Sequence, residues 1–269
     1  MAQTGKILRL RRILDAGTGR TVIVALDHGL FMGPVKGLEK PIDVVEKVLK
    51  AGATSLVMTP GICRLVAERV KGRAGIILRV DGATTVYGSD FCDVRMICRV
   101  KDALRIGADA VIAMGYIGSP KENETLGNLG LIARQCEEFG VPLVAEMLPV
   151  QCERIKDPYA SDVVSLAARV GAELGADLIK THYTGNEKTF KGVVSSCPVP
   201  IVIAGGPKMK TTENALKVAN DAINAGAVGV AFGRNVWQHE APDNMTKALI
   251  RIVNKRDSVA QAMKELKKT

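Results

Sequence analysis

Eight short apolar runs recur along the chain, and glycine or proline bounds them. They are rich in Val, Ile and Leu and do not alternate with polar residues, which is typical of strands buried on both faces of a parallel sheet. The runs are residues 21–29, 54–61, 75–82, 109–116, 141–149, 177–185, 199–206 and 228–235. The pattern therefore predicts eight parallel strands.

Helical patterns fill most of the gaps between these runs. Five segments carry apolar residues at i, i+3, i+4 and i+7, and each ends at a glycine that can adopt the left-handed cap conformation. The segments are residues 41–52, 94–107, 129–140, 160–175 and 212–226. The connection between the second and third runs is short and less clearly helical.

A small repeat links helices to strands. A helix-ending Gly-Ala leads into a strand at residues 51–57, 106–112, 174–180 and 225–231, before the second, fourth, sixth and eighth runs. This two-strand period around a ring of eight predicts an α/β fold: a single (β/α)8 barrel domain over residues 1–269, with a short N-terminal extension. A doubly wound open sheet is the alternative, but no G-x-G-x-x-G follows the first strand.

The composition is that of a globular protein and narrows the choice of partners. The chain has 269 residues, is 47% hydrophobic and carries a formal net charge of +9. Because Lys and Arg are spread along the chain without a recognition motif, anionic small molecules are favoured over nucleic acid. No run of ~18 apolar residues and no signal-type apolar region is present, so no membrane partner is expected.

The six cysteines predict neither a metal site nor a disulfide framework. None forms a C-x-x-C, and none has a histidine at metal-ligand spacing. They are Cys63, Cys92, Cys98, Cys136, Cys152 and Cys197. We therefore expect reduced thiols in a cytoplasmic protein.

Lys180 is unexpected at the end of the sixth apolar run. Function in a barrel gathers at the C-terminal ends of the strands, and a charged amine in an apolar wall is unfavourable unless it is paired. Lys180 is therefore either a structural partner of Asp27 or a nucleophile that forms a Schiff base. Attack on a carbonyl needs a free amine, which desolvation and a cationic neighbour such as Arg79 or Lys208 would favour.

Two acidic residues also end strands. Asp27, after the first strand, could accept a hydroxyl proton from a substrate, orient the lysine or cap a loop. Glu146 interrupts the fifth run, so burial would raise its pKa toward acid–base work, unless the residue forms a salt bridge to a neighbouring strand. His28 and His182 are more typical of structural histidines.

The last two strands predict a phosphate-binding site. The segments "AGGPK" and "FGRN" place Gly205, Gly206 and Gly233 at adjacent strand ends, where backbone N–H groups can approach an anion. Lys208 and Arg234 add positive charge. A tight turn explains each glycine segment alone, but phosphate recurs after strands seven and eight of this fold. Together the segments favour a phosphorylated small-molecule substrate.

Four segments resemble a known family. "VALDHG", "LIKTHYTG", "VPIVIAGGPK" and "GVAFGRNVWQ" are similar to the archaeal-type class I fructose-bisphosphate aldolases, in the wider group with deoxyribose-phosphate aldolase. The similarity runs across nearly the whole chain. The last two segments are shared with two relatives of different reaction. These are the transaldolase-like aminodideoxyheptulosonate synthase and the thiolase-like enzyme that acts on phosphorylated autoinducer-2 and coenzyme A.

The resemblance implies a metal-independent lyase without a cofactor, because the iminium of a Schiff base takes the place of a Lewis acid. It implies the Schiff base on Lys180, Asp27 in the active site and a homo-oligomer, often a decamer. It assigns the substrate phosphate to Gly205, Gly206, Gly233 and Arg234.

One segment departs from the aldolases, which carry a tyrosine as general acid–base in a Y-P-R-G motif after strand five. Here the segment reads "EMLPVQ", with Leu148 in place of the tyrosine and Val150 in place of the arginine. Leucine cannot move a proton. Either Glu146, Tyr116 or Tyr183 takes over that role, or the reaction is different.

Three functions therefore stay open. The leading hypothesis is a Schiff-base aldolase for a phosphorylated ketose such as the glycolytic sugar fructose 1,6-bisphosphate. The alternative is transaldolase-like synthesis, or thiolase-like acyl transfer to coenzyme A from a phosphorylated ketone, with the same lysine. The third is a barrel that only binds a phosphorylated ligand.

Overall fold

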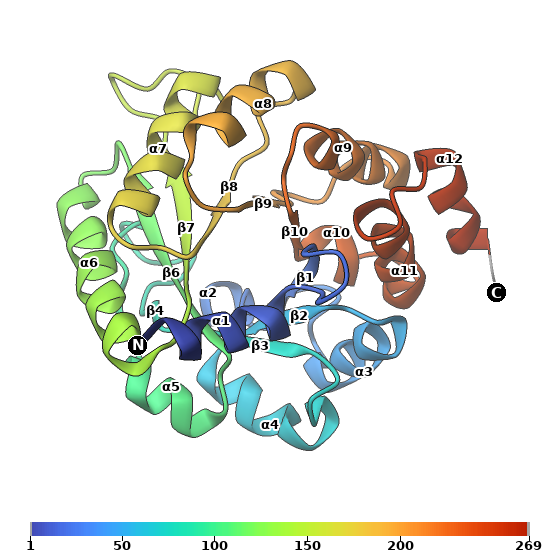
Figure 1. Ribbon diagram of the computed structural model, residues 1–269, viewed down its shortest axis with the longest axis horizontal. Helices are drawn as coiled ribbons and strands as arrows, with labels where there is room; N and C mark the ends of the chain where they lie inside the picture. Colours follow the sequence, from blue (N-terminus) through green and yellow to red (C-terminus); the bar gives the residue numbers. More distant parts are fainter. Residues whose placement is uncertain (1, 268–269) are drawn as a thin grey trace.

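Eight parallel strands close into a barrel in the computed structural model, which describes residues 2–267 (Figure 1). Around the barrel the order is β1-β10-β9-β8-β7-β6-β3-β2. The strands are β1 (Thr21–Ala25), β2 (Ser55–Met58), β3 (Gly75–Arg79), β6 (Ala110–Ile117), β7 (Leu143–Pro149), β8 (Leu178–Thr181), β9 (Ile201–Ala204) and β10 (Gly229–Phe232). Seven of them lie within one predicted run each, and β6 extends one residue beyond its run, so the (β/α)8 barrel is confirmed and the open sheet is excluded.

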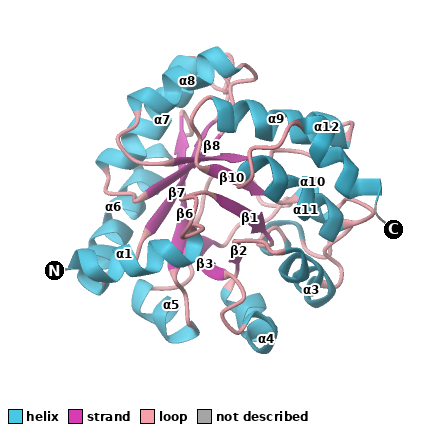
Figure 2. Cartoon of the chain, turned by 45° about the vertical axis from the view of Figure 1, so that its right-hand side comes forward, coloured by secondary structure: helices cyan, strands magenta, loops and turns pink. Residues whose placement is uncertain are grey.

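The helices form an outer layer around the strands (Figure 2). Their bounds are α3 (Pro41–Ala51), α4 (Pro60–Val70), α5 (Val100–Ile106), α6 (Glu122–Phe139), α7 (Ser161–Glu173), α8 (Glu187–Ser196), α9 (Thr212–Asn224) and α11 (Pro242–Val253). The five glycines expected to end helices all have positive φ: Gly52, Gly107, Gly140, Gly175 and Gly226. Within residues 2–267, no helix combines the length and the apolar character needed to cross a membrane.

The helix predicted over residues 94–107 begins only at Val100, so the first part of that prediction is wrong. Two residues of the segment, Arg95–Met96, form the short strand β5 instead. This strand pairs antiparallel with β4 (Asp81–Gly82). Val94 is 2% exposed and packs with Phe31 rather than on a helix face. Burial in this satellite cluster thus overrides the helical period.

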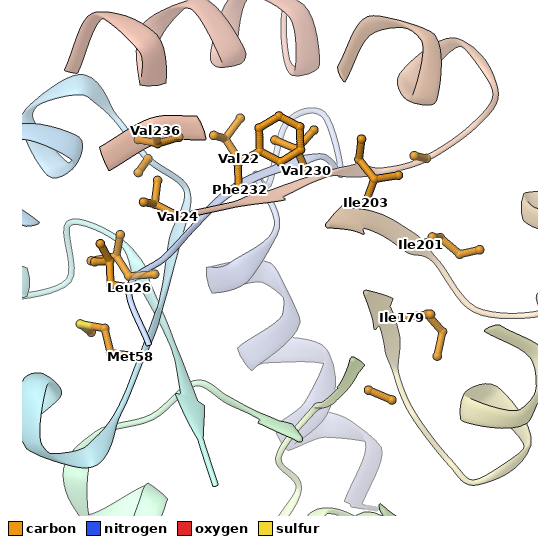
Figure 3. Close-up of a cluster of buried hydrophobic side chains, with 14 of the residues drawn as sticks. Val22, Val24, Leu26, Met58, Ile179, Ile201, Ile203, Val230, Phe232 and Val236 are labelled. Atoms are coloured by element: carbon orange, nitrogen blue, oxygen red, sulfur yellow. The ribbon is translucent and has the colours of Figure 1, made fainter. Parts of the chain in front are cut away.

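Alternate residues of the barrel strands enter two separate cores. Val22 and Val24 of β1 lie in the outer core between strands and helices, whereas Ile23 and Ala25 lie in the core inside the barrel. Figure 3 shows part of the outer core, where Val22 and Val24 lie beside their register partners on β10. This double burial explains why the runs are apolar throughout.

Short helices complete the fold. They are α1 (Ala2–Ile13), α2 (Gly29–Met32), α10 (Arg234–Trp237) and α12 (Val259–Ala262), followed by a 3-10 turn over Met263–Lys267. The last residue of α1, Ile13, belongs to the core inside the barrel. Arg12 pairs at 3.0 Å with Asp109, just before β6 begins. Helix α1 therefore covers the N-terminal ends of the strands and leaves the C-terminal ends open.

Gly229→Ala should destabilise the barrel strongly. A Cβ at Gly229 would lie 2.0 Å from the Thr21 carbonyl oxygen on β1, and backbone cannot move aside. We expect a loss of about 3 kcal/mol or more in the free energy of unfolding, measured by urea titration. Gly192→Ala is the matched control, because its Cβ meets open space in helix α8 and should stabilise by about 0.5–1 kcal/mol. Equal destabilisation of both variants would contradict this account.

Candidate active site

A cavity of about 340 Å³ opens at the C-terminal ends of the strands. Seven of the eight site residues expected from the sequence line it: Asp27, Glu146, Lys180, Gly205, Gly206, Gly233 and Arg234. These residues come from β7 and β8, from the segments that follow β1 and β9, and from the start of α10 after β10. The barrel thus brings together side chains that are far apart along the chain.

Lys180 lies one residue before the end of β8 and forms an ion pair with Glu146. The two residues are register partners on β8 and β7, and the Nζ to Oε1 distance is 2.6 Å. Both are buried, with 5% of Lys180 and 6% of Glu146 exposed. The ion-pair partner expected for the lysine, Asp27, is therefore wrong, because the carboxylate in contact with Nζ is that of Glu146.

Arg79 lies at the centre of three carboxylates, which we call the carboxylate cluster. Its Nε donates to Asp27 Oδ2 at 2.9 Å, one terminal nitrogen donates to Asp81 Oδ1 at 3.1 Å, and the other donates to Glu146. Asp81 Oδ2 in turn accepts a hydrogen bond of 2.6 Å from the backbone N–H of Met114. The guanidinium is 1% exposed and thereby joins β1, β4, β6 and β7.

The carboxylate cluster changes the pKa values of its members in opposite directions. Burial favours protonation of Asp27, but Arg79 and His28 outweigh it and lower the pKa of this carboxyl. Burial also opposes ionisation of Glu146, but Lys180 and Arg79 lower its pKa below the usual value. The expectation that burial would raise the pKa of Glu146 is therefore wrong. For Asp81, burial prevails and raises the pKa.

The position of the expected acid–base tyrosine is occupied by Leu148, which lines the cavity. Tyr116 lines it too, and its hydroxyl contacts Met114 Sδ. Burial, reinforced by Glu146, raises the pKa of Tyr116, so the hydroxyl stays protonated. Tyr183 does not line this cavity, and its ring packs on Phe190 at a centroid distance of 5.2 Å. Of the two candidate tyrosines, only Tyr116 faces the lysine's cavity.

Gly205, Gly206, Gly233 and Arg234 form the wall that we call the phosphate cradle. Gly206 has a φ of +61°, and a Cβ at Gly233 would lie 2.6 Å from His28 Cε1. Both positions therefore favour glycine. The Arg234 Nε is buried and finds no hydrogen-bond partner within residues 2–267. An unpaired buried donor is unfavourable, and a bound anion would satisfy it.

Asn235 holds the loop of the phosphate cradle in place. Its Nδ2 donates to the carbonyl oxygen of Gly205 at 2.8 Å, and its Oδ1 accepts from the Met209 N–H at 2.8 Å. Sequence reasoning missed this residue, gave Asp81 no role and expected Arg79 only as a cationic neighbour of Lys180. The available signal was a buried polar residue at a strand end, which needs partners.

Lys208 is the one expected site residue that lies outside the cavity. It is exposed, and its ammonium donates to the Gln238 carbonyl oxygen. It lines a neighbouring groove on the outer side of the β9 loop. Lys208 is therefore not the cationic neighbour of Lys180, whereas Arg79 shares Glu146 with that lysine.

The comparisons with known proteins agree with this geometry. The family model described as DeoC/LacD family aldolase matches residues 21–239, a range that includes every residue lining the cavity. The chain belongs to this aldolase family. The family resemblance read from the four sequence segments is therefore confirmed.

Two relatives and one solved structure define the similarity. An uncharacterized aldolase from Saccharolobus solfataricus is 38% identical, over 98% of this chain and 99% of that protein. A 3-hydroxy-5-phosphonooxypentane-2,4-dione thiolase from Yersinia pseudotuberculosis is 39% identical, over 94% of this chain and 84% of that protein. An archaeal fructose-1,6-bisphosphate aldolase, solved with its catalytic lysine covalently bound to the carbinolamine intermediate, is 33% identical. Its TM-score is 0.83, over 91% of this chain and 98% of that one.

Asp27→Asn should make the free energy of unfolding less dependent on pH in the acidic range. Because the folded-state pKa of Asp27 lies below its usual value of 3.8, its contribution is fully present above that pH and is lost as the pH falls below it. Below pH 3.8 the wild type should lose up to about 1.4 kcal/mol per pH unit more than the variant, measured by urea titration.

The control for this measurement is Asp43→Asn, at an exposed position on α3. It should leave the acid limb close to that of the wild type. An Asp27→Asn curve that runs parallel to the wild type down to pH 2.5 would contradict the assignment of the lowered pKa.

Proposed function

We propose that the protein is a class I aldolase-type lyase that forms a Schiff base between Lys180 and a phosphorylated ketose or ketone. One observation carries the proposal: a buried lysine and an arginine with an unpaired Nε line the same cavity. The lysine supplies a nucleophile for a carbonyl. The arginine and the glycines of the phosphate cradle supply a site for the anionic group of the same molecule.

The first step would be attack of Lys180 on the carbonyl carbon. Nζ must lose a proton before it attacks, and Glu146 Oε1 at 2.6 Å is in reach to accept it. Loss of water from the carbinolamine then gives an iminium. The positive charge forms close to Glu146 and the carboxylate cluster, which stabilises it.

Carbon–carbon cleavage would follow with the iminium as the electron sink. A base removes the proton of the substrate hydroxyl, the bonding pair moves toward the iminium, and an aldehyde leaves while an enamine stays on Lys180. Asp27 is our candidate base because Arg79 keeps it ionised. Glu146 is the candidate for the proton transfers that the family tyrosine would perform. Protonation and hydrolysis of the enamine restore the free lysine.

The relatives support a Schiff-base lyase more strongly than one particular substrate. The archaeal aldolase structure has a catalytic lysine bound to a carbinolamine, and we carry this role over to Lys180. Fructose 1,6-bisphosphate as substrate is part of the proposal. We also propose a cytoplasmic homo-oligomer, on the family resemblance.

Leu148 favours a second candidate, thiolase-like acyl transfer to coenzyme A through the same lysine. An apolar side chain stands where the aldolases carry their tyrosine, and a relative at 39% identity is named as a thiolase for a phosphorylated dione. Transaldolase-like synthesis shares the lysine and is distinguished by its need for an acceptor. A barrel that only binds phosphorylated ligands would form no covalent adduct.

Borohydride reduction should trap a substrate adduct on Lys180. After incubation with dihydroxyacetone phosphate and borohydride, the intact mass should rise by one reduced adduct. Lys180→Met should abolish this rise, whereas Lys188→Met, at an exposed position on α8, should retain it. Absence of any adduct with dihydroxyacetone phosphate, fructose 1,6-bisphosphate and 3-hydroxy-5-phosphonooxypentane-2,4-dione would reject the Schiff base.

Leu148→Tyr should separate the two candidate reactions. If only the hydroxyl of the missing tyrosine limits aldol cleavage, the variant should cleave fructose 1,6-bisphosphate about 100-fold faster than Leu148→Phe, which adds the ring alone. Product assays with 3-hydroxy-5-phosphonooxypentane-2,4-dione, with and without coenzyme A, complete the test. Turnover of the dione by the wild type only with coenzyme A would select the thiolase-like reaction.

A further inference from the structure

A groove of about 620 Å³ lies on the outer side of the β9 loop, next to the catalytic cavity. The groove and the cavity share the residues His182, Ala204, Gly205 and Gly206. The glycine loop of the phosphate cradle therefore forms the boundary between two connected spaces. The sequence predicted an anion site at this loop, but it did not predict a groove on its other side.

We propose that this groove is a second anion site, which holds a phosphate or pyrophosphate group of a second reactant whose other end reaches Lys180. The proposal rests on the proposed function, because Lys180 would then already carry the first substrate. The binding itself requires no Schiff base. It can therefore be measured independently of the reaction.

The groove carries an excess of positive charge. Among the described residues, three lysines line it, Lys208, Lys210 and Lys217, and Asp221 is its only lining acid. Lys217 pairs with Asp221, which leaves a formal charge of two from the other lysines. Lys210 is exposed and forms no ion pair within residues 2–267. Such a concentration of lysines along a concave surface attracts anions.

Tyr183 adds a buried donor without a partner. The residue is 8% exposed and lines the groove, yet its hydroxyl has no hydrogen-bond partner within residues 2–267. Burial, with added repulsion from Asp221 and Glu187, raises the pKa of this hydroxyl to about 12, so it is a donor at neutral pH. A phosphate oxygen would satisfy it. Scattered surface lysines alone would not require such a ligand.

Within residues 2–267, the catalytic cavity offers an anion only one free cation. Among the lysines and arginines that line it, Arg79 and Lys180 are paired with carboxylates, which leaves Arg234 of the phosphate cradle. Away from the cradle the cavity is largely apolar, with Phe31, Met32, Val86, Phe91, Met114 and Leu148 in its lining. A second anionic group therefore fits the groove rather than the apolar wall.

His182 and Tyr159 form the wall of the groove near the catalytic cavity. Their ring centroids are 4.5 Å apart, and both residues line the groove. Burial lowers the pKa of His182, so its imidazole is neutral at pH 7 and adds no charge of its own. A second reactant would pass beside this aromatic pair to reach Lys180.

Titration calorimetry with inorganic pyrophosphate tests the proposal. The wild type should bind it at two sites, and Arg234→Met should remove the one in the phosphate cradle. Tyr183→Phe and the double variant Lys208→Ala/Lys210→Ala should each weaken the other site about tenfold or more, as expected for loss of a hydrogen bond to a charged group. The matched control is Lys47→Ala/Lys50→Ala on α3, which does not line the groove and should keep both sites.

Two outcomes would overturn the proposal. One is a single pyrophosphate site in the wild type that Arg234→Met removes. The other is a second site that the control weakens as much as the groove variants do. Lys180→Met should retain both sites, so failure of borohydride trapping with intact groove binding would reject the proposed function and not the anion site. If the groove variants lost both pyrophosphate binding in the groove and the dihydroxyacetone phosphate adduct, the groove would belong to the first substrate. That result would reject a site for a second reactant.

Discussion

The candidate site depends on the ion pairs of Arg79. A buried carboxylate is unfavourable unless it is paired, and this guanidinium pairs with three of them. It keeps Asp27 and Glu146 ionised in spite of their burial, and Glu146 then fixes the ammonium of Lys180. The proposed nucleophile on β8 is thus oriented by a cation on β3, with the carboxylate on β7 between them.

The closed barrel makes these pairs possible because register sets which strand ends meet. Glu146 and Lys180 are direct partners on adjacent parallel strands, so their side chains emerge on the same face. At the opposite end α1 covers the barrel, and Ile13 fills its interior. Water is therefore excluded from the barrel interior at the N-terminal ends of the strands, while the polar side chains lie at their C-terminal ends.

The sequence allowed prediction of what local patterns determine. Strands buried on both faces produce long apolar runs, and five helices end at glycines with positive φ, so the barrel could be predicted from residue order alone. The segment from Val94 to Ile97 misled because its residues follow a helical period, but Val94 is buried in a tertiary cluster and Arg95–Met96 pair with β4. The predicted direction of the pKa shift of Glu146 and the predicted place of Lys208 in the cavity were wrong for a related reason. Both depend on neighbours from other strands or loops, which a single sequence does not reveal.

The short β4–β5 ladder has a consequence for how this site can diversify. Asp81 is fixed on one side by Arg79 and on the other by its pairing with Met96. The intervening residues include Val86 and Phe91, which line the candidate active-site cavity yet are themselves 52% and 44% exposed. The residues between β4 and β5 can therefore change in evolution while the lysine and its carboxylates stay in place. Such changes would alter which ligands enter the cavity.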